Sequence, residues 1–524
     1  MDESPTRNKS VNMVLSSDGI DKSKRPHYVT VNTAADKCVI YDVTSNQLLE
    51  VSPLLEKWLA SLPWDEETPP KALVEALGKS ETRAAADEAG ELFSRGHLRP
   101  IPIGRLKYVF NEAVFMDIAD AGQYRMQLEV TEQCNLRCRY CGYTGNTFGR
   151  SHGLKKMSVA TAKKAVDWFL ARSTHGNTRQ PTSIAFYGGE PLLNLEVIEE
   201  AIKFATDDCG RNDIHWSLTT NGTKLSDEVW KRLIKLNVHV TVSLDGEGPI
   251  HDRYRVFESG AGTYDTITHN LEWCRSKYPN FYKENVNFNI CIAPPCKLEA
   301  VRRFATAKNG LIATSAYYSV FWADIEGIPE FATKVYNLVK DEALLTDWWD
   351  EYIKLTCSEE ANSPEELSDW VFLHALFRKQ WTRLKVMGVP RMGEQKEQYI
   401  NLPCQPGLDK LLVRVDGSFA MCEKCYADPT FEIGNVNDGI RLDRVRSCID
   451  MLERMRPQQC AQCWALSFCS VCFAYMRPGS SQSMEENIAA KCEPIKRSAM
   501  NLLRLHAKST KLYRTYSKAL ALGD

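Results

Sequence analysis

The sequence lacks the features that would direct it to a membrane, to export or to nucleic acid. No apolar run approaches the length of a bilayer-spanning segment. The first residues, Met1 to Pro5, contain no apolar stretch of the kind found in a signal peptide. The net charge is −2, so there is no excess of positive charge for a nucleic acid or an anionic membrane. These absences predict a cytoplasmic protein with neither partner.

Cysteine, in contrast, is abundant. The chain has 18 cysteines among 524 residues. In a reducing compartment such cysteines are more often metal ligands or buried thiols than disulfides. Half of them fall between Cys404 and Cys492, and three more lie at Cys134, Cys138 and Cys141. These two regions are therefore expected to bind metal.

The length predicts roughly two to four domains. Changes in composition and periodicity divide the chain into six parts. In order they are a disordered tail (1–25), a small α+β unit (26–105), an α/β unit (106–330), a helical bridge (331–403), a cysteine-rich unit (404–495) and a C-terminal helix (496–524).

The α+β unit reads as three strands followed by three helices. The strands are predicted at 27–31, 38–43 and 47–51, and the helices at 53–62, 70–77 and 82–96, with Gly96 as a C-terminal cap.

This order, with the phrases at Val51–Leu59 and Glu91–Leu98, resembles the PqqD-like, winged-helix-like domain that binds leader peptides of ribosomally made natural products. An open sheet edge can accept an extended peptide as a further strand. An unrelated winged helix without a ligand is the alternative.

The α/β unit alternates strands and helices, which predicts a parallel sheet. The predicted strands are 126–130, 183–187, 215–220, 239–244, 286–290 and 316–321. Six such units are too few for a closed eight-stranded barrel, so we expect an open, partial one whose chemistry gathers at the carboxyl ends of its strands.

Distinctive motifs follow four successive strands of this unit. The cysteine trio follows the first, and the glycine-containing segments 187–191, 219–222 and 243–246 follow the next three. Three thiolates on one short loop can hold three corners of a cubane iron–sulfur cluster and leave the fourth iron open for a ligand. A zinc knuckle completed by a distant fourth ligand is the alternative.

The CxxxCxxC trio with Tyr140 before its last cysteine, followed by the GGEP segment, resembles the signature of the radical S-adenosylmethionine (SAM) superfamily. The resemblance implies a partial (β/α)6 TIM-type barrel. It also implies that Cys134, Cys138 and Cys141 hold a 4Fe–4S cluster that cleaves S-adenosyl-L-methionine to a hydrogen-abstracting radical.

The same resemblance assigns cofactor-binding residues. Glu190, with the two preceding glycines, would meet the methionine amino group, and Arg255 of the HDxxR element would meet the carboxylate, which a guanidinium grips well. A surface salt bridge is the alternative role for Arg255. The full cofactor-binding set is Tyr140, Gly188, Gly189, Glu190, Thr220, Asn221, Ser243, Asp245 and Arg255.

The C-terminal cysteines resemble the SPASM extension of radical enzymes, although two residues rather than three separate Cys469 from Cys472. The resemblance implies two auxiliary 4Fe–4S clusters, three clusters in all. The outer set is Cys460, Cys463, Cys469 and Cys492, and the inner set is Cys404, Cys422 and Cys472, with Cys425 as the nearest spare thiol. Cys448 fits neither set and is expected to pack. A pair of zinc ribbons is the alternative.

Glu423 follows Cys422 directly, where sulfatase-maturing relatives carry an aspartate thought to act as a base. Glu423 is therefore a candidate catalytic base, with a solvated turn residue as the alternative.

Together these patterns predict a radical SAM oxidoreductase that modifies a ribosomally made precursor peptide. Hydrogen abstraction would lead to a carbon–sulfur, carbon–carbon or carbon–oxygen crosslink, with a two-electron oxidation. The expected partners are the precursor, bound through its leader, and an external electron donor of flavodoxin or ferredoxin type. The alternatives are an anaerobic sulfatase-maturase-like, formylglycine-generating enzyme and a non-catalytic iron–sulfur scaffold that binds peptide.

Overall fold

The computed structural model describes most of the chain. The described residues are 26–33, 38–62, 71–100, 105–141, 152–173, 181–293, 296–312, 317–322, 342–356, 363–384, 387, 392–394, 397–425, 429–476 and 483–520. The tail predicted at 1–25 lies outside them. Within these ranges no helix combines the length and the apolar character needed to cross a bilayer.

The N-terminal unit has the predicted order of elements. An antiparallel sheet of β1 (Tyr28–Thr33), β2 (Cys38–Asp42) and β3 (Gln47–Val51) precedes α1 (Pro53–Ala60), α2 (Lys71–Leu77) and α3 (Lys79–Ser94). Ser52 caps α1, because its side chain accepts a 3.0 Å hydrogen bond from the Leu55 amide. The helix α3 begins three residues before its predicted start, and Gly96, at φ +89°, turns the chain after it.

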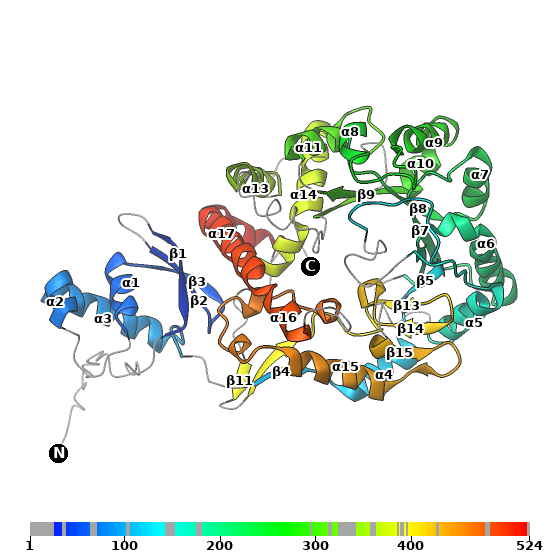
Figure 1. The fold of residues 1–524 in the computed structure, drawn as a ribbon. Helices are drawn as coiled ribbons and strands as arrows, with labels where there is room; N and C mark the ends of the chain where they lie inside the picture. Colours follow the sequence, from blue (N-terminus) through cyan, green and yellow to red (C-terminus); the bar gives the residue numbers. More distant parts are fainter. Residues whose placement is uncertain are drawn as a thin grey trace, which may run out of the picture.

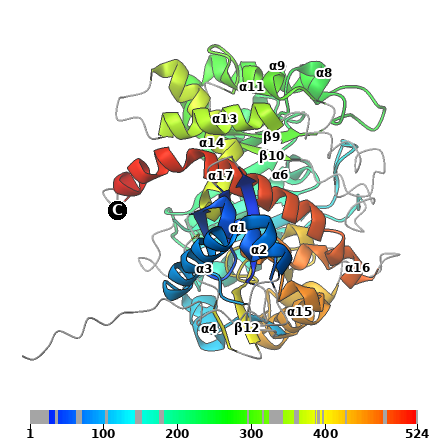
Figure 2. The ribbon, with the colours of Figure 1, turned by 90° about the vertical axis from the view of Figure 1, so that its left-hand side faces the viewer.

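The N-terminal sheet is covered on both faces. On one face Ile40 packs against Trp58 of α1 and Ala89 of α3. On the other face Tyr41 belongs to the main core of the molecule, and its ring centroid lies 5.4 Å from that of Phe468 in the cysteine-rich region. The long helix α17 (Cys492–Leu520) lies against β1 (Figure 2). The small sheet is therefore docked on the rest of the protein rather than tethered to it.

The centre of the molecule is a ten-stranded sheet with the order β10-β9-β8-β7-β6-β5-β13-β14-β15-β16. Its first six strands are parallel neighbours and confirm the six predicted strands. They are β5 (Arg125–Thr131), β6 (Ser183–Gly188), β7 (His215–Thr220), β8 (His239–Ser243), β9 (Val286–Ile292) and β10 (Tyr317–Trp322).

Helices between these strands cover the outer side of the sheet (Figure 1). They are α5 (Val159–Leu170), α6 (Leu195–Lys203), α7 (Asp227–Lys235), α8 (Gly248–His251), α9 (Tyr264–Lys277), α10 (Pro279–Asn285) and α11 (Leu298–Thr306).

The cysteine-rich region extends this sheet, which the sequence pattern did not indicate. The strand β13 (Leu411–Val413) pairs in parallel with β5. The antiparallel strands β14 (Ser418–Ala420), β15 (Glu432–Asn435) and β16 (Gly439–Ile440) follow. The segment between Cys404 and Cys422 thus pairs with the strand that leads into the cysteine trio.

The remaining elements join these parts. A second sheet has the order β11 (Met392–Glu394), β12 (Glu397–Asn401) and β4 (Arg105–Val109). The helices are α4 (Glu112–Ala121), α13 (Glu342–Thr356), α14 (Pro364–Leu384), α15 (Leu442–Met455) and α16 (Met484–Ala489).

Two expected boundaries differ from the structure. The bridge predicted as helical over 331–403 also contains β11 and β12, because β12 finds a parallel partner in β4 almost 300 residues away. The C-terminal helix begins at Cys492 rather than Lys496, since Pro494 falls in its first turn, where proline is tolerated. Aromatic side chains on α13 and α14 are buried, among them Trp349, Phe372 and Phe377.

The packing predicts the effect of removing one core side chain. Trp230 on α7 is fully buried, and its Nε1 donates a 2.9 Å hydrogen bond to the Asn270 carbonyl. Trp230→Ala should lower the free energy of unfolding by about 3–5 kcal/mol. Leu367→Ala, at a half-exposed position on α14, should change it by less than about 0.5 kcal/mol. Equal shifts in urea unfolding of the two variants would contradict this packing.

Candidate functional site

The cysteine trio lies on the loop that follows β5, and backbone hydrogen bonds fix this loop from two sides. The amides of Arg137 and Arg139 donate to the carbonyls of Val256 and Tyr254, at 2.8 and 2.9 Å. On the other side the Glu190 amide donates to the Gln133 carbonyl at 2.7 Å. The loop is therefore held between the segments that follow β6 and β8.

Glycine is required where β6 ends against this loop. Gly188 has φ +138°, and a Cβ there would lie 2.1 Å from the Thr131 carbonyl oxygen. A Cβ on Gly189 would lie equally close to the Gln133 carbonyl oxygen. Any side chain at either position would push the cysteine loop away.

The three thiols are partly or fully buried and influence one another electrostatically. Burial raises the pKa of Cys134 to about 11 and that of Cys138 to about 12. Thiolates are the form that binds iron, so the cationic iron of a cluster would have to offset this burial. Among the described residues, we find no group of three His, Cys, Asp or Glu side chains that is close enough to bind a single metal ion. Three thiols on one loop fit the three-cysteine ligation of a cubane.

Glu190 connects the cysteine loop to the end of β7. Its buried carboxylate accepts hydrogen bonds from the Thr220 hydroxyl at 2.7 Å, the Asn221 amide at 2.7 Å and the Leu192 amide at 3.1 Å. Burial raises its pKa to about 6, although these hydrogen bonds partly counteract the rise. The Asn221 side chain in turn donates to Asn135 Oδ1 at 3.0 Å and lies 3.9 Å from Cys134 Sγ.

A second buried cluster of polar groups forms where β8 and β9 end. Asp245 Oδ2 accepts a 2.9 Å hydrogen bond from Arg255 Nε and another from the Tyr140 hydroxyl, and its Oδ1 accepts from the Cys291 amide at 3.0 Å. The Arg255 guanidinium lies 5.3 Å from the centre of the Tyr140 ring. Arg255 is therefore part of a buried ion pair rather than a surface salt bridge, and Ser243 is buried at the end of β8.

His251 forms hydrogen bonds with the backbone of this cluster and with Thr263. Its Nδ1 accepts a 3.2 Å hydrogen bond from the Asp245 amide, and its Nε2 lies 3.0 Å from the Thr263 hydroxyl. Burial lowers its pKa to about 4, so the imidazole is neutral near pH 7. The sequence placed His251 in the HDxxR element but assigned it no role, and Cys291 was not predicted as part of the site. Cys291 could have been found, since it follows the fifth predicted strand directly.

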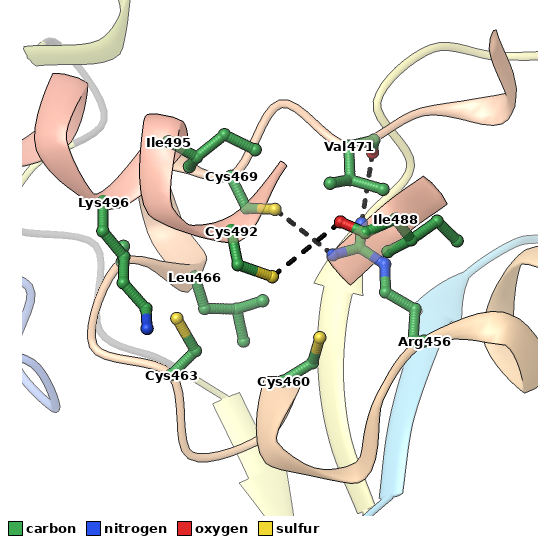
Figure 3. Close-up of a pocket in the computed structure, with 11 residues that line it drawn as sticks. Arg456, Cys460, Cys463, Leu466, Cys469, Val471, Ile488, Cys492, Ile495 and Lys496 are labelled. Atoms are coloured by element: carbon green, nitrogen blue, oxygen red, sulfur yellow. Dashed lines mark hydrogen bonds between the residues drawn. The ribbon is translucent and has the colours of Figure 1, made fainter. Parts of the chain in front are cut away.

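The outer cysteines come together in a pocket (Figure 3). Cys460 ends the short 3₁₀ helix η7 (Gln458–Cys460), Cys469 follows η8 (Leu466–Phe468), and Cys492 begins α17. Cys463 and the Arg456 side chain complete the group. All four members of the outer set therefore line one pocket.

The inner cysteines also gather, and Cys425 joins them. Cys422 and Cys425 have their sulfur atoms 3.7 Å apart, and the hydrogen bond between them lowers the pKa of Cys422. Burial raises the pKa of Cys404 to about 12, with smaller contributions from Cys422 and Cys472. Cys448 is buried elsewhere and donates to the Thr430 carbonyl, as expected of a packing residue.

Glu423 lies beside the inner group but is already engaged. Its Oε2 forms an ion pair with Lys410 Nζ at 2.8 Å. Burial alone would raise its pKa, but the ion pair with Lys410, a backbone hydrogen bond and the nearby Lys424 together outweigh burial, and the pKa is lowered. A lowered pKa weakens a carboxylate as a base, so the geometry does not single out Glu423 for that role.

Comparisons with known proteins agree with this geometry. Residues 128–302 match the model of the radical SAM superfamily. A cysteine-type anaerobic sulfatase-maturating enzyme of Clostridium novyi is 32% identical over 30% of this chain and 40% of its own length. The radical SAM cyclopropyl synthase TigE of Paramaledivibacter caminithermalis is 27% identical over 31% of this chain and 33% of its own length. The chain thus spans less than half the length of these curated relatives.

A solved structure shares the fold over a longer range. The structure of anSMEcpe with bound AdoMet has a TM-score of 0.50 and 20% identity, and it covers 72% of this chain and 96% of its own.

His251 gives the site a pH dependence that can be measured. Because its pKa is lowered from 6.5 to about 4, the unfolded chain binds a proton between these values and the folded chain does not. Stability that is present above pH 6.5 should therefore fall as the pH drops, by about 2 kcal/mol at pH 5. His251→Asn keeps an acceptor for the Asp245 amide and has no group that titrates in this range. Urea unfolding of the variant at pH 7 and pH 5 should therefore lack this part of the loss of stability. An identical pH dependence in the variant would contradict a neutral, buried His251.

The match to the superfamily model covers the cysteine loop, the GGEP segment and the polar cluster around Asp245, all at the carboxyl edge of one parallel sheet. Residues 128–302 are therefore similar to the radical SAM superfamily.

Proposed function

We propose that the chain is a radical SAM enzyme that introduces a crosslink into a ribosomally made precursor peptide. The observation that carries the proposal is the convergence of three thiols and three further strand-end motifs at one edge of the parallel sheet, within the residues that match the superfamily. When bound there, a 4Fe–4S cluster and S-adenosyl-L-methionine would supply a radical that abstracts hydrogen from the peptide.

The residues around the trio would bind and orient the cofactor. Gly188, Gly189 and Glu190 would face its amino group, since a carboxylate attracts a cationic amine. Arg255 uses Nε for Asp245, and a carboxylate ligand would take its Nη nitrogens. The remaining polar side chains would bind the sugar and the base; they are Tyr140, Thr220, Asn221, Ser243 and Asp245.

The two C-terminal cysteine groups would hold auxiliary 4Fe–4S clusters and accept an electron after hydrogen abstraction. The outer group supports this role because its four thiols line one pocket. The inner group supports it because Cys425 supplies a fourth thiol beside Cys422. An external flavodoxin or ferredoxin would provide electrons to the protein. With Cys425 as its fourth ligand, the inner cluster would have no open iron. It would then act as an electron carrier rather than bind substrate.

The N-terminal sheet would capture the leader of the precursor and raise the local concentration of its core segment at the radical site. Its strand β3 is an edge strand, which can pair with an extended peptide. The packing of Tyr41 on Phe468 would keep this edge close to the cysteine-rich region.

Maturation of a sulfatase is the second candidate, and the similarity to the Clostridium novyi enzyme favours it. That reaction oxidises a cysteine or serine to formylglycine. Two observations favour a crosslinking enzyme instead. The additional N-terminal unit is docked on the core, and the pairing of Glu423 with Lys410 lowers the basicity of the candidate base.

Substitution of the trio tests the radical chemistry. Cys134→Ala, Cys138→Ala and Cys141→Ala should each reduce formation of 5′-deoxyadenosine from S-adenosylmethionine to background, because the core cluster would lose a ligand. Chromatography of the reaction of the reconstituted, reduced full chain measures this product.

Cys448→Ala is the matched control, since Cys448 is equally a cysteine but packs away from both groups. This variant should cleave the cofactor at the wild-type rate. A wild-type chain that carries its clusters but forms no 5′-deoxyadenosine would instead support a non-catalytic peptide-binding scaffold.

A photoreactive amino acid tests the leader-binding edge. Glu50 is exposed on β3, so p-benzoylphenylalanine at this position should crosslink to a precursor peptide co-expressed from a small neighbouring reading frame. p-Benzoylphenylalanine in place of Glu299, which is exposed on α11, should not crosslink to the peptide. Equal crosslinking at both positions, or at neither, would argue against capture of the leader at this edge.

A further inference from the structure

We propose that Arg456 is a positioning residue that orients the outer cysteine group and raises the reduction potential of the cluster held there. The proposal rests on the outer auxiliary cluster of the proposed function. Arg456 directly follows α15, and its guanidinium lies at the wall of the pocket that Cys460, Cys463, Cys469 and Cys492 line (Figure 3).

The guanidinium is buried and held by several hydrogen bonds. Arg456 is only 9% exposed. Its Nε donates to the Tyr108 hydroxyl oxygen at 3.0 Å, and its Nη2 donates to the Val471 carbonyl at 3.1 Å. Its Nη1 donates to Cys469 Sγ at 3.2 Å. These partners come from β4 and the cysteine-rich segment, so they fix the charge against the thiol.

Within the described part of the chain, none of the ion pairs joins Arg456 to a carboxylate. The nearest acid along α15 is Glu453, which accepts instead from Lys107 Nζ at 3.2 Å and from the Tyr108 amide at 2.8 Å. The other cation at the pocket, Lys496, is paired with Glu493 at 2.9 Å. Arg456 therefore differs from Lys496 in having no acidic partner.

Tyr108 does not provide the missing negative charge. Burial raises its pKa to about 12, although Arg456 lowers it in part, so the phenol is neutral near pH 7 and accepts as a hydroxyl oxygen. A buried guanidinium without a counter-charge is costly. Four thiolates on a 4Fe–4S cluster would provide that counter-charge at the place where Arg456 points its Nη1.

The expected consequence is a change in redox behaviour. When the cluster accepts one electron, its net charge becomes more negative by one unit. A fixed positive charge and an N–H donor to sulfur stabilise the reduced form more than the oxidised form. Arg456 should thus make the outer cluster a better acceptor for the electron that leaves the substrate.

Redox titration of the full chain, followed by electron paramagnetic resonance, tests the proposal. The titration is done in a Cys134→Ala, Cys138→Ala, Cys141→Ala background, so that only the auxiliary clusters give signals. Arg456→Gln removes the charge and should lower the equilibrium constant for reduction of one auxiliary cluster by at least tenfold. For a one-electron reduction this corresponds to a midpoint potential that is lower by about 59 mV. The other auxiliary signal should not move.

Two variants separate charge from packing. Arg456→Lys keeps the charge and should retain most of the wild-type potential. Arg414→Gln removes a guanidinium that is equally buried, at 9%, but lies beside Glu432 rather than the outer thiols, and it should move neither signal.

Each outcome has a definite meaning. Full iron content with an unchanged potential in Arg456→Gln would overturn the role of Arg456 and leave the proposed function intact. If Arg456→Gln lost the outer cluster, retention by Arg456→Lys with a potential near wild type would support the role of the charge, and loss in both variants would overturn it. A wild-type chain without iron at the outer cysteines would instead overturn that part of the proposed function.

Discussion

The contact between the cysteine loop and the end of β6 is the constraint on which the rest of the site depends. The amides of Gly189 and Glu190 donate to the carbonyls of Thr131 and Gln133, at 2.9 and 2.7 Å. The absence of side chains at Gly188 and Gly189 permits this close approach. The Glu190 carboxylate then bonds to the end of β7, so three successive strand ends become one rigid support. The three thiols therefore lie on a loop that is hydrogen-bonded to the neighbouring strand ends.

The segments that contain the C-terminal cysteines also pack against the central part of the molecule. The strand β13, which lies between Cys404 and Cys422 in the sequence, pairs with β5. The outer group lies between β4, α15 and α17, and the N-terminal sheet packs on the loop that contains Phe468. The N-terminal sheet, the two C-terminal cysteine groups and the central sheet are therefore linked through packed elements.

Local patterns predicted much of this structure. Alternation of strands and helices is a short-range signal, and all six predicted strands of the central sheet are present. The four strand-end motifs were predicted to meet because parallel strands have their carboxyl ends at one edge. Pairings between distant segments leave no such local trace, so the addition of β13 to β5 and of β12 to β4 could not be foreseen. The ion pairs of Arg255 with Asp245 and of Glu423 with Lys410 join residues whose charges alone do not specify partners.

Mass spectrometry of the precursor peptide after co-expression with the chain tests the central claim most directly. A crosslinking enzyme should give a peptide that has lost two hydrogens, that yields few fragments between the joined residues and that does not react with a hydrazine reagent for aldehydes. A peptide of unchanged mass would contradict the account, and a product that reacts as an aldehyde would assign the chain to formylglycine formation instead.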